Sequence, residues 1–384
     1  METEQLRKLV ADMVAIPSVN ALDGSPAAER GEAAMAQFIA ARLGEAGISC
    51  ELVEAAPGRP SVVARIPGES DEAIWFDAHI DTVSGEGMEF EPFTPRVEGD
   101  TLYGRGSADN KGSVAAMMAA MIAIAESGTK PPATVIFSGT ADEEYRMRGL
   151  LSLLDSGMTA RAAVVGEPTN LEVVVAHKGV ARFRVTTTGK AAHSSRPEAG
   201  VNAIYRMGKV LQALEAYAKR GIGRETDAML GKATLSVGVI RGGEYANVVP
   251  DLCEIQVDRR LLPGEEGRRA VADVRNYLTD AIQDDIGMEV ASPDIVVPPL
   301  SLSSDDPLVH AVSAKVREVT GRAPVEGMSG TTHAGQFAQR GIPALVFGPG
   351  AMGQAHTATE KLDLSQLDQA AKIYEALMRS GART

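Results

Sequence analysis

The sequence predicts an α/β protein in which a doubly wound larger domain is interrupted by a smaller α+β domain. Helical and strand-like patterns alternate along the first half, which is typical of a parallel sheet with helices on both faces. From about residue 179 the strands alternate apolar and polar residues, as antiparallel strands with one open face do. After about residue 294 the first pattern returns. We therefore expect one domain from residues 1–178 and 295–384, and an inserted domain from residues 179–294.

The elements of the larger domain follow from periodicity and apolar runs. Helical spacing of apolar residues predicts helices over 2–15, 29–46, 112–126, 305–320 and 364–380. Short apolar runs predict buried strands over 61–65, 73–80, 134–139, 162–166 and 344–347. Ligands bind at the carboxyl ends of the strands in such a sheet, so the residues that follow these strands are candidates for a functional site.

The inserted domain shows a strand, a helix, two strands and a helix. Strand-like runs and helical runs cover, in turn, 180–188, 200–219, 233–240, 252–260 and 265–286. This order predicts a small α+β sandwich with one face of its sheet open. The run 180–188 is the candidate for an exposed edge strand, which is a natural surface for pairing with a second copy.

Composition excludes two classes of partner. The net charge of −13 disfavours binding to a phosphate backbone, and an aromatic fraction of 4% offers few rings on which bases could stack. The longest apolar stretch, 114–125, is well short of a membrane span, and the first residues lack an apolar signal core. The two cysteines are too few for a disulfide framework. We therefore expect a cytoplasmic protein with no nucleic-acid and no membrane partner.

The strand over 73–80 leads into the sequence His79-Ile80-Asp81. Residues two apart in a strand point to the same face, so the imidazole and the carboxylate would stand side by side. One could bind a metal ion while the other orients it. A surface ion pair is the simpler alternative, because a His two residues from an Asp often arises by chance.

Acidic residues follow two further segments. Asp109 lies in a Gly-rich loop, GRGSADNKG, that leads into a helix, where it could instead cap the helix start. The strand over 134–139 is followed by DEE, and such carboxylates repel one another unless cations neutralise them, although a solvated loop also tolerates acids. Adjacent residues point to different sides, so one of Glu143 and Glu144 could bind metal while the other stays free as a base.

Two more candidate ligands follow later strands. Glu167 comes directly after the strand over 162–166, and His356 lies in a Gly-rich loop after the strand over 344–347. A lone loop His is usually a surface residue. Together with the earlier candidates these residues complete five N/O ligands, a set that suits two zinc-type ions bridged by one carboxylate: His79, Asp109, Glu144, Glu167 and His356.

The order of the motifs HID, GRGSADNKG, DEE, GEP, AAHSSRPE and GQAH resembles the dinuclear-zinc peptidase and deacylase family. That family includes acetylornithine deacetylase, succinyl-diaminopimelate desuccinylase, aminoacylase and glutamate carboxypeptidase. The match spans nearly the whole chain, with the inserted domain where the family has its lid and dimerisation domain. The resemblance implies a zinc-exopeptidase-like catalytic domain.

The resemblance also implies which residues hold the ions. His79 and Glu167 would hold one divalent ion, and Glu144 and His356 the other. Asp109 would bridge the two. Zinc is the first expectation for both ions, with cobalt or manganese as alternatives, because these metals overlap in their preference for N/O ligands.

Three further residues receive catalytic roles from the resemblance. Asp81 would orient His79, and Glu143 would be the general base that takes a proton from the attacking water and gives it to the departing amine. His193, in the inserted domain, would donate a hydrogen bond to the oxyanion, often in the active site of a neighbouring subunit. Without the resemblance, His193 would be interpreted as a residue near a helix start.

Substrate binding is the part that the motifs define least. Arg260 corresponds to the Arg that clamps a substrate carboxylate in relatives, with Asn247 as a polar helper. Arg259 and Arg260 alternate across a strand, so at least one should simply be solvated. Two departures from the family pattern lie near the expected site: His333 stands where relatives usually have an acidic residue, and 145–148 replaces a small, Gly-containing turn.

These observations predict a dinuclear metallohydrolase that cleaves the amide bond of an N-acyl amino acid, as acetylornithine deacetylase or succinyl-diaminopimelate desuccinylase does. A carboxypeptidase or dipeptidase with the same centre is the enzymatic alternative, since only the pocket would differ. A relative that keeps the fold but only binds a ligand is the third possibility. The expected partners are a small N-acyl amino acid or short peptide and a second copy of the chain, as a homodimer.

Overall fold

The computed structural model describes residues 1–20, 31–222, 226–283 and 285–382, which form two compact units. The first unit comprises Met1–Val175, Ser301–Glu326 and Thr332–Thr384, and the second comprises Ala176–Leu300 and Gly327–Thr331. The range expected for the inserted domain, 179–294, lies within the second unit. The unit extends beyond that range by a few residues at each end and takes in one short segment that follows later in the chain.

Within the described residues, the first unit is built on a mixed sheet of nine strands. In sheet order they are β1 (Cys50–Ala56), β2 (Arg59–Ile66), β6 (Ala133–Thr140), β3 (Ser70–His79), β7 (Ala162–Val165), β20 (Ala344–Val346), β8 (Val173–His177) and β18 (Leu300–Ser301), with β19 (Val325–Met328) paired to β8. The central strands β6, β3, β7 and β20 are parallel, whereas β1, β2 and β8 pair antiparallel at the flanks. The predicted α/β class is confirmed, and the antiparallel flanks were not foreseen.

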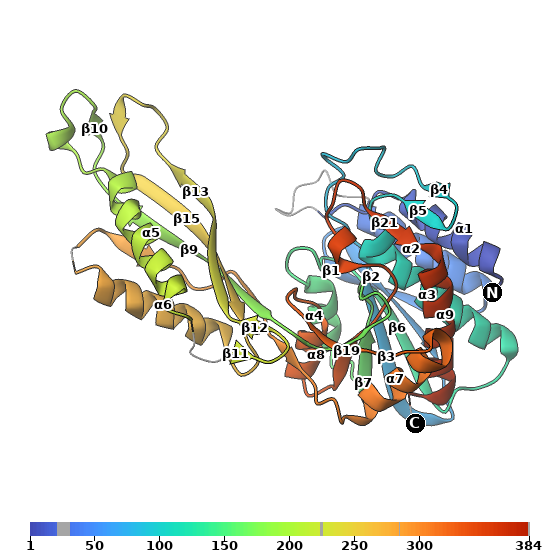
Figure 1. The fold of residues 1–384 in the computed structure, drawn as a ribbon. Helices are drawn as coiled ribbons and strands as arrows, with labels where there is room; N and C mark the ends of the chain where they lie inside the picture. Colours follow the sequence, from blue (N-terminus) through green and yellow to red (C-terminus); the bar gives the residue numbers. More distant parts are fainter. Residues whose placement is uncertain (21–30, 223–225, 284, 383–384) are drawn as a thin grey trace. The chain divides into compact units, whose positions relative to one another are not determined.

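Helices cover both faces of this sheet (Figure 1). Their bounds are α1 (Thr3–Val14), α2 (Gly31–Glu45), α3 (Gly112–Ser127), α4 (Arg148–Asp155), α7 (Pro307–Thr320), α8 (Ala334–Gln339) and α9 (Leu364–Ser380). Helices α1, α2, α3, α7 and α9 supply the main core, while α4 packs on β1 and β2 and α8 packs on β7 and β20. The first two residues of the helix predicted over 29–46 lie outside the described residues.

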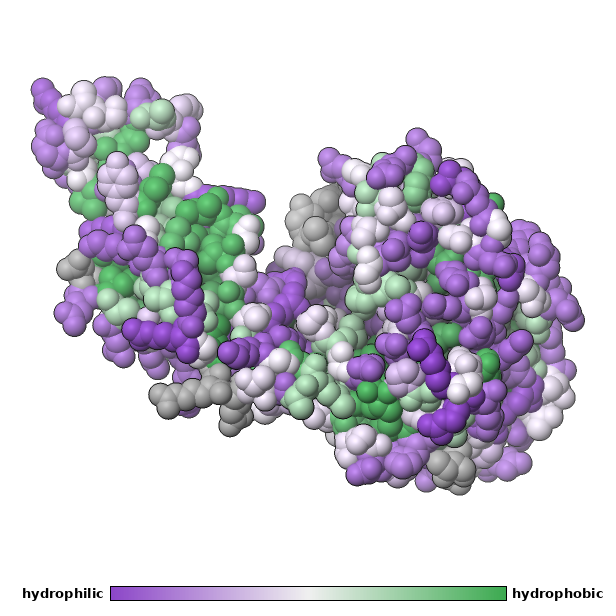
Figure 2. All heavy atoms as spheres, viewed as in Figure 1, coloured by the Kyte–Doolittle hydropathy of each residue, from purple (hydrophilic) through white to green (hydrophobic). Residues whose placement is uncertain are grey.

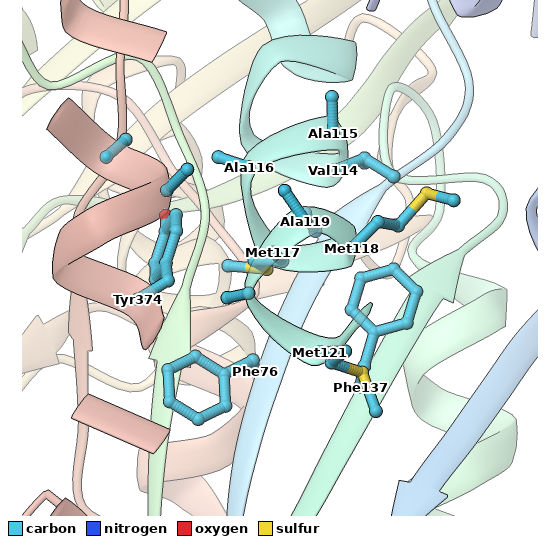
Figure 3. Packing of buried hydrophobic residues seen from close by; sticks show 14 of the residues in the cluster. Phe76, Val114, Ala115, Ala116, Met117, Met118, Ala119, Met121, Phe137 and Tyr374 are labelled. Carbon is cyan, nitrogen blue, oxygen red and sulfur yellow. The ribbon is translucent and has the colours of Figure 1, made fainter. Parts of the chain in front are cut away.

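The main core anchors the helix that follows the Asp109 loop. Figure 3 shows Met118 and Met121 of α3 beside Phe137 of β6. Tyr374 of α9 meets the ring of Phe76 edge-on at a centroid distance of 6.0 Å. Small and flexible side chains let α3 approach the sheet closely, and twelve of the sixteen residues of the helix are buried. The start of α3 is therefore fixed by packing.

The strand β3 separates two different surfaces because its side chains alternate between the faces of the sheet. Ile74, Phe76 and Ala78 face the main core. The intervening residues point to the face covered by α4 and α8, where the Trp75 ring meets Phe337 of α8 edge-on at 5.0 Å. Asp77 and His79 share this second face, one pleat apart.

The second unit is an antiparallel sheet with two helices (Figure 1). Its strands, in sheet order, are β13 (Thr234–Gly242), β15 (Leu252–Leu261), β9 (Gly179–Thr188) and β16 (Met288–Val290), with β17 (Ile295–Val297) also paired to β9. The helices are α5 (Ala203–Lys219) and α6 (Gly267–Ala281). The short pairs are β10 (Ala192–His193) with β14 (Val248–Val249) and β11 (Thr226–Asp227) with β12 (Gly231–Lys232).

The expectation that 180–188 is an edge strand is wrong. These residues form β9, which pairs with β15 on one side and with β16 and β17 on the other. The exposed edge is β13, which pairs only with β15 among the described strands. The alternation in β9 reflects one face packed on α5 and α6 and one open face, and both central and edge strands show that pattern.

A small sheet of β21 (Lys361–Asp363), β5 (Thr101–Tyr103) and β4 (Arg96–Glu98) lies apart from the main sheet and brings the chain after His356 beside the chain before Asp109. Single 3₁₀ turns cover Pro197–Ala199 and Met352–Gln354. In the part of the chain that the structure describes, every helix is too short or too polar to cross a bilayer.

Candidate metal centre

His79 ends β3 with its ring fixed from one side. Its Nδ1 lies 2.9 Å from the backbone oxygen of Asp81 and 3.5 Å from a carboxylate oxygen of the same residue. A carbonyl oxygen only accepts, so Nδ1 carries a hydrogen. The Nε2 atom lies 3.0 Å from Oδ1 of Asp109. Nδ1 is thus engaged, which leaves Nε2 as the nitrogen that a metal ion would take, and the acceptor nearest to Nδ1 is the backbone oxygen of Asp81 rather than its carboxylate.

Asp109 is held by a residue that the sequence did not reveal. The carboxylate of Glu360 accepts hydrogen bonds from the backbone N–H groups of Gly106, Ala108 and Asp109, each 3.0 Å long. Arg105 donates to the same carboxylate over 2.7 Å. Glu360 therefore gathers the amides of the loop and leaves the Asp109 side chain free to face the histidines.

The two carboxylate oxygens of Asp109 face two different histidines. Oδ1 lies 3.0 Å from Nε2 of His79, and Oδ2 lies 3.3 Å from Nε2 of His356. His356 also lies 3.1 Å from the carboxylate of Glu144. Its backbone has a φ of 61°, in the left-handed region that few residues other than glycine adopt, and this turn aims the ring at the carboxylates.

The ligand atoms form two clusters that share Asp109. One is His79, Asp109 and Glu167, the other is Asp109, Glu144 and His356, and in each the ligand atoms lie within 4.8 Å of one another. Imidazole nitrogens and carboxylate oxygens in this proportion suit divalent ions of the zinc, cobalt and manganese type, with the shared carboxylate between them. The five residues predicted as ligands are therefore brought together, and they fit two ions.

The pKa values of the side chains in these two clusters are those of a site that needs positive charge to neutralise its carboxylates. Hydrogen bonds to Asp109 and Glu144 raise the pKa of His356 to about 10. Burial opposes protonation of His79, but its bonds with Asp109 and Asp81 raise its pKa well above the ordinary value. Burial likewise raises the pKa of the Glu167 carboxyl well above its usual range. Protons occupy the places that metal ions would take, because buried carboxylates must be neutralised.

Asp81 holds the turn that carries the two glutamates. Its carboxylate accepts the backbone N–H of Glu143 and that of Glu144, each over 3.1 Å, and the side-chain amide of Asn20 over 2.6 Å. Asp81 is fully buried. Besides standing beside His79, it therefore fixes the position of Glu143 and Glu144.

Glu143 stands outside both ligand clusters. Among the described residues no hydrogen bond is made to its carboxylate. Burial raises the pKa of Glu143 to about 7, and the neighbouring carboxylates of Glu144 and Asp81 act in the same direction. A carboxylate with these properties is poised to take and return a proton near neutral pH.

The departure at 145–148 shapes the turn after the glutamates. Met147 has a φ of 58°, a left-handed conformation for which glycine is the usual residue, and its side chain is buried. Arg148 begins α4 and pairs with the buried carboxylate of Asp142. Arg146 is exposed and stacks its guanidinium 4.9 Å from the ring centroid of Tyr145. Burial of the Met147 side chain and the ion pair between Arg148 and Asp142 thus stabilise this turn, although Met147 stands where glycine would be usual.

Three predicted site residues belong to the second unit, where two of them are neighbours. His193 lies in β10 and pairs with Val248, and the backbone N–H of Ser194 donates to the carbonyl of Asn247 over 3.0 Å. The N–H of Ser195 donates to Nδ1 of His193 over 3.2 Å, so the hydrogen of the neutral ring sits on Nε2. Among the described residues Nε2 of His193 has no partner.

Arg260 lies elsewhere in the second unit. It pairs in register with Val180 on β9, whereas the segment with His193 follows Thr188, eight residues further along that strand. Arg260 is half-buried and ion-paired with Asp258 at 2.7 Å. The expectation that at least one of Arg259 and Arg260 is simply solvated is wrong, because Arg259 is buried and pairs with Glu265, and Arg260 is half-buried and pairs with Asp258.

Known proteins share the sequence family and the fold of this chain. The profile of peptidase family M20/M25/M40 matches residues 75–380. The chain belongs to this family. It is 31% identical over 375 residues to an acetylornithine deacetylase of Myxococcus xanthus, covering 94% of this chain and 93% of that protein. The chain is thus a hydrolytic enzyme, and amide hydrolysis with metal ions is its chemistry.

Solved structures of M20 proteins have the same fold. An M20-family metallo-carboxypeptidase from Sulfolobus solfataricus superposes with a TM-score of 0.81 at 18% identity, covering 100% of both chains. A dinuclear metal-binding M20 peptidase from Bacillus subtilis superposes with a TM-score of 0.71 at 18% identity, covering 98% of this chain and 97% of that one. The predicted architecture, a catalytic domain with an inserted smaller domain, is that of these proteins.

Proposed function

We propose that this enzyme hydrolyses the amide bond of an N-acyl amino acid at two divalent metal ions. The observation that carries the proposal is the position of Asp109 between His79 and His356, with Glu143 beside the clusters but in neither of them. His79 and Glu167 would hold one ion, Glu144 and His356 the other, and Asp109 both. The ions would lower the pKa of a water molecule and polarise the scissile carbonyl. Zinc is the first candidate, with cobalt or manganese as alternatives.

The chain's own residues account for the proton transfers. Glu143 takes a proton from the attacking water and later gives it to the departing amine. Asp81 keeps Glu143 in place through its backbone N–H, and it keeps His79 in the tautomer that leaves Nε2 free. Asp81 thus supports both the proposed base, Glu143, and the proposed ligand, His79.

Substrate would be held by residues of the second unit. The free Nε2–H of His193 suits a donor to the oxyanion, and Asn247 beside it suits a polar contact with the substrate. The guanidinium of Arg260 is suited to bind a carboxylate of the substrate. Thr188 lies eight residues beyond Val180 on β9, which is about 26 Å at ~3.3 Å per residue. His193 and Arg260 of one chain are therefore too far apart to hold one small substrate.

That separation supports a homodimer in which His193 and Asn247 serve the active site of the other copy. The exposed strand β13 and apolar residues beside it offer a pairing surface: Ile204, Tyr205, Ile240 and Leu252. Figure 2 shows apolar surface gathered on the second unit, next to the region that holds α5 in Figure 1. An exposed edge strand flanked by apolar residues favours pairing with a second copy.

The variant Ile240→Lys tests the dimer. We expect light scattering to show a dimer for the wild type and a monomer for the variant, with turnover lost in parallel. Leu52→Lys places the same charge at an exposed position of the first unit and should leave the dimer intact. A monomeric wild type with full turnover would remove both the dimer and the role of His193 in the second active site.

Chelation tests the metal chemistry. Removing divalent ions should abolish amide cleavage, and zinc or cobalt should restore it. Glu143→Ala should abolish turnover while metal content stays unchanged, because Glu143 lies in neither ligand cluster. Turnover that is indifferent to chelator would contradict the metal centre, and turnover retained by Glu143→Ala would contradict the base.

A carboxypeptidase or dipeptidase is the second candidate, since the carboxypeptidase from Sulfolobus solfataricus has the same fold. Release of free amine from N-acetyl amino acids, N-succinyl amino acids and free dipeptides separates the two. We expect the N-acyl amino acids to be preferred. Preference for dipeptides would replace the deacylase proposal with the peptidase.

A further inference from the structure

Glu32 and Arg59 form a buried ion pair outside both ligand clusters. Glu32 stands in the first turn of α2 and is fully buried, and Arg59 begins β2 and is 5% exposed. Two nitrogens of the guanidinium, Nε and Nη2, donate to the two carboxylate oxygens of Glu32. Such a pair often adds little net stability, because removing two charges from water offsets their attraction. What the pair does for the molecule therefore depends on its other contacts.

Both members of the pair also contact Asp142, the residue before Glu143. The Glu32 carboxylate accepts the backbone N–H of Asp142 over 2.9 Å. The Nη2 atom of Arg59 lies 3.0 Å from a carboxylate oxygen of Asp142, which is fully buried. Asp142 is thus held at its main chain by one member of the pair and at its side chain by the other.

Asp142 in turn closes the loop that carries Glu143 and Glu144. Its carbonyl oxygen accepts the backbone N–H of Arg146 over 3.1 Å and that of Met147 over 2.6 Å, so the chain folds back around the two glutamates. The φ of Asp142 is 68°, in the left-handed region that few residues other than glycine adopt. A residue keeps such a conformation only where its surroundings impose it, and here contacts hold its N–H, its side chain and its carbonyl.

We propose that Glu32 is a positioning residue for the general base of the proposed reaction, and that it acts through Asp142 with Arg59 as its partner. Glu32 holds the N–H of Asp142. Asp81 holds the next N–H of the chain, that of Glu143. Two carboxylates from different elements thus fix successive amides of the turn. The inference rests on the proposed function, since the base belongs to that reaction.

Glu32→Gln tests this role with little change in shape. The Gln side chain keeps one oxygen for the Asp142 N–H, but its amide nitrogen faces Nε of Arg59, which is also a donor, so the ion pair is broken. We expect kcat to fall about 10- to 100-fold at saturating metal, because a displaced base is slow to take the proton. KM should be unchanged, because Glu32 does not touch the substrate.

Metal affinity gives a second readout, since the ligand Glu144 lies on the same turn. Competition with a fluorescent chelator should show that Glu32→Gln binds one of its two zinc ions about 10-fold more weakly. Asp368→Asn is the matched control, because it breaks the ion pair between Asp368 of α9 and Arg7 of α1. We expect it to lower stability to urea while kcat and zinc affinity stay as in the wild type.

The comparison of the two variants decides the proposal. Wild-type kcat in Glu32→Gln, or an equal loss of kcat in Asp368→Asn, would mean that the pair only stabilises the fold and would overturn the proposal. The wild type is assayed first with its best N-acyl amino acid. If the wild type cleaves no amide, the proposed function fails instead, which keeps the two failures distinct.

Amide hydrogen exchange needs neither turnover nor a foldable variant. In ¹⁵N-labelled, zinc-loaded wild type, NMR should show slow exchange of the Asp142 amide, because a buried carboxylate holds its hydrogen. Where Glu32→Gln folds, exchange of this amide should be faster than in the wild type. Exchange in the wild type at the rate of an unprotected amide would overturn the proposal, since Glu32 would then not hold the turn.

Discussion

The carboxylate of Glu360 accepts the backbone N–H of Asp109 over 3.0 Å, although 251 residues separate them in the chain. It also accepts from Gly106, Ala108 and Arg105, so one carboxylate sets the conformation of the loop that presents the shared ligand. Small shifts in a ligand's support change metal affinity strongly. The position of Asp109 between the two histidines therefore depends on Glu360.

Glu360→Gln should weaken metal binding without removing any ligand. The Gln amide would turn a donor toward N–H groups and leave Arg105 without its charge partner, so we expect about 10- to 100-fold lower metal affinity. The free energy of unfolding should fall by about 3 kcal/mol. Competition with a fluorescent chelator and urea unfolding measure the two effects. Glu98→Gln, in an exposed ion pair with Arg96, is the control; an equal loss there would contradict the role of Glu360.

Because the two ligand clusters share only Asp109, we expect that one metal ion can be lost while the other stays bound. His356 belongs only to the cluster with Glu144, and His79 only to the cluster with Glu167. His356→Ala should therefore lower metal content from two ions per chain to one, measured by elemental analysis after dialysis. His79→Ala should do the same by emptying the other cluster. Loss of both ions in either variant at saturating metal would mean that the clusters do not bind independently.

Asp81→Asn should slow turnover more than it lowers metal content. The Asn side chain retains one oxygen for the two N–H groups of Glu143 and Glu144, and its amide hydrogens face donors. We expect kcat to fall about 10- to 100-fold, because the base is no longer held at its place. Asp71→Asn, exposed near the start of the same strand, is the matched control. Wild-type kcat in Asp81→Asn would show that the turn is held by other contacts.

The clustering of the candidate ligands could be predicted from the sequence because these residues follow buried strands. His79 closes β3, Glu167 follows β7, and Glu143 and Glu144 follow β6, so the parallel centre of the sheet brings them to one edge. Glu360 could not be found in this way, since its partners are backbone amides of a distant loop and backbone groups carry no sequence signal.

Which strands pair with each other was harder to predict than where the strands lie in the sequence. The strand β9 was placed within two residues of its observed bounds, yet its position in the centre of the sheet was missed. An alternating pattern reports one buried face, and it says nothing of what lies beside the strand. The partner of His333 was also missed, because Asp77 lies 256 residues away and points to the opposite face of β3 from the core residues that define this strand.

Acid should destabilise the metal-free protein in part through His177. This residue is fully buried, its Nδ1 lies 2.9 Å from the carbonyl of Lys178, and its Nε2 has no partner within the described residues. Burial lowers the pKa of His177 from 6.5 to about 4. Between these values the unfolded chain binds a proton that the folded chain does not. The free energy of unfolding therefore falls as pH is lowered through this window, by about 2 kcal/mol at pH 5.

His177→Asn removes the titrating group while its amide can still donate to the carbonyl of Lys178. Urea unfolding of chelated protein at pH 7 and pH 5 gives the loss of stability on acidification for each variant. Comparing losses, rather than stabilities at one pH, cancels the cost of the substitution itself. We expect a smaller loss for His177→Asn than for the wild type, and an unchanged loss for the exposed His310→Asn. Equal losses in all three proteins would show that His177 is not the group that responds to acid.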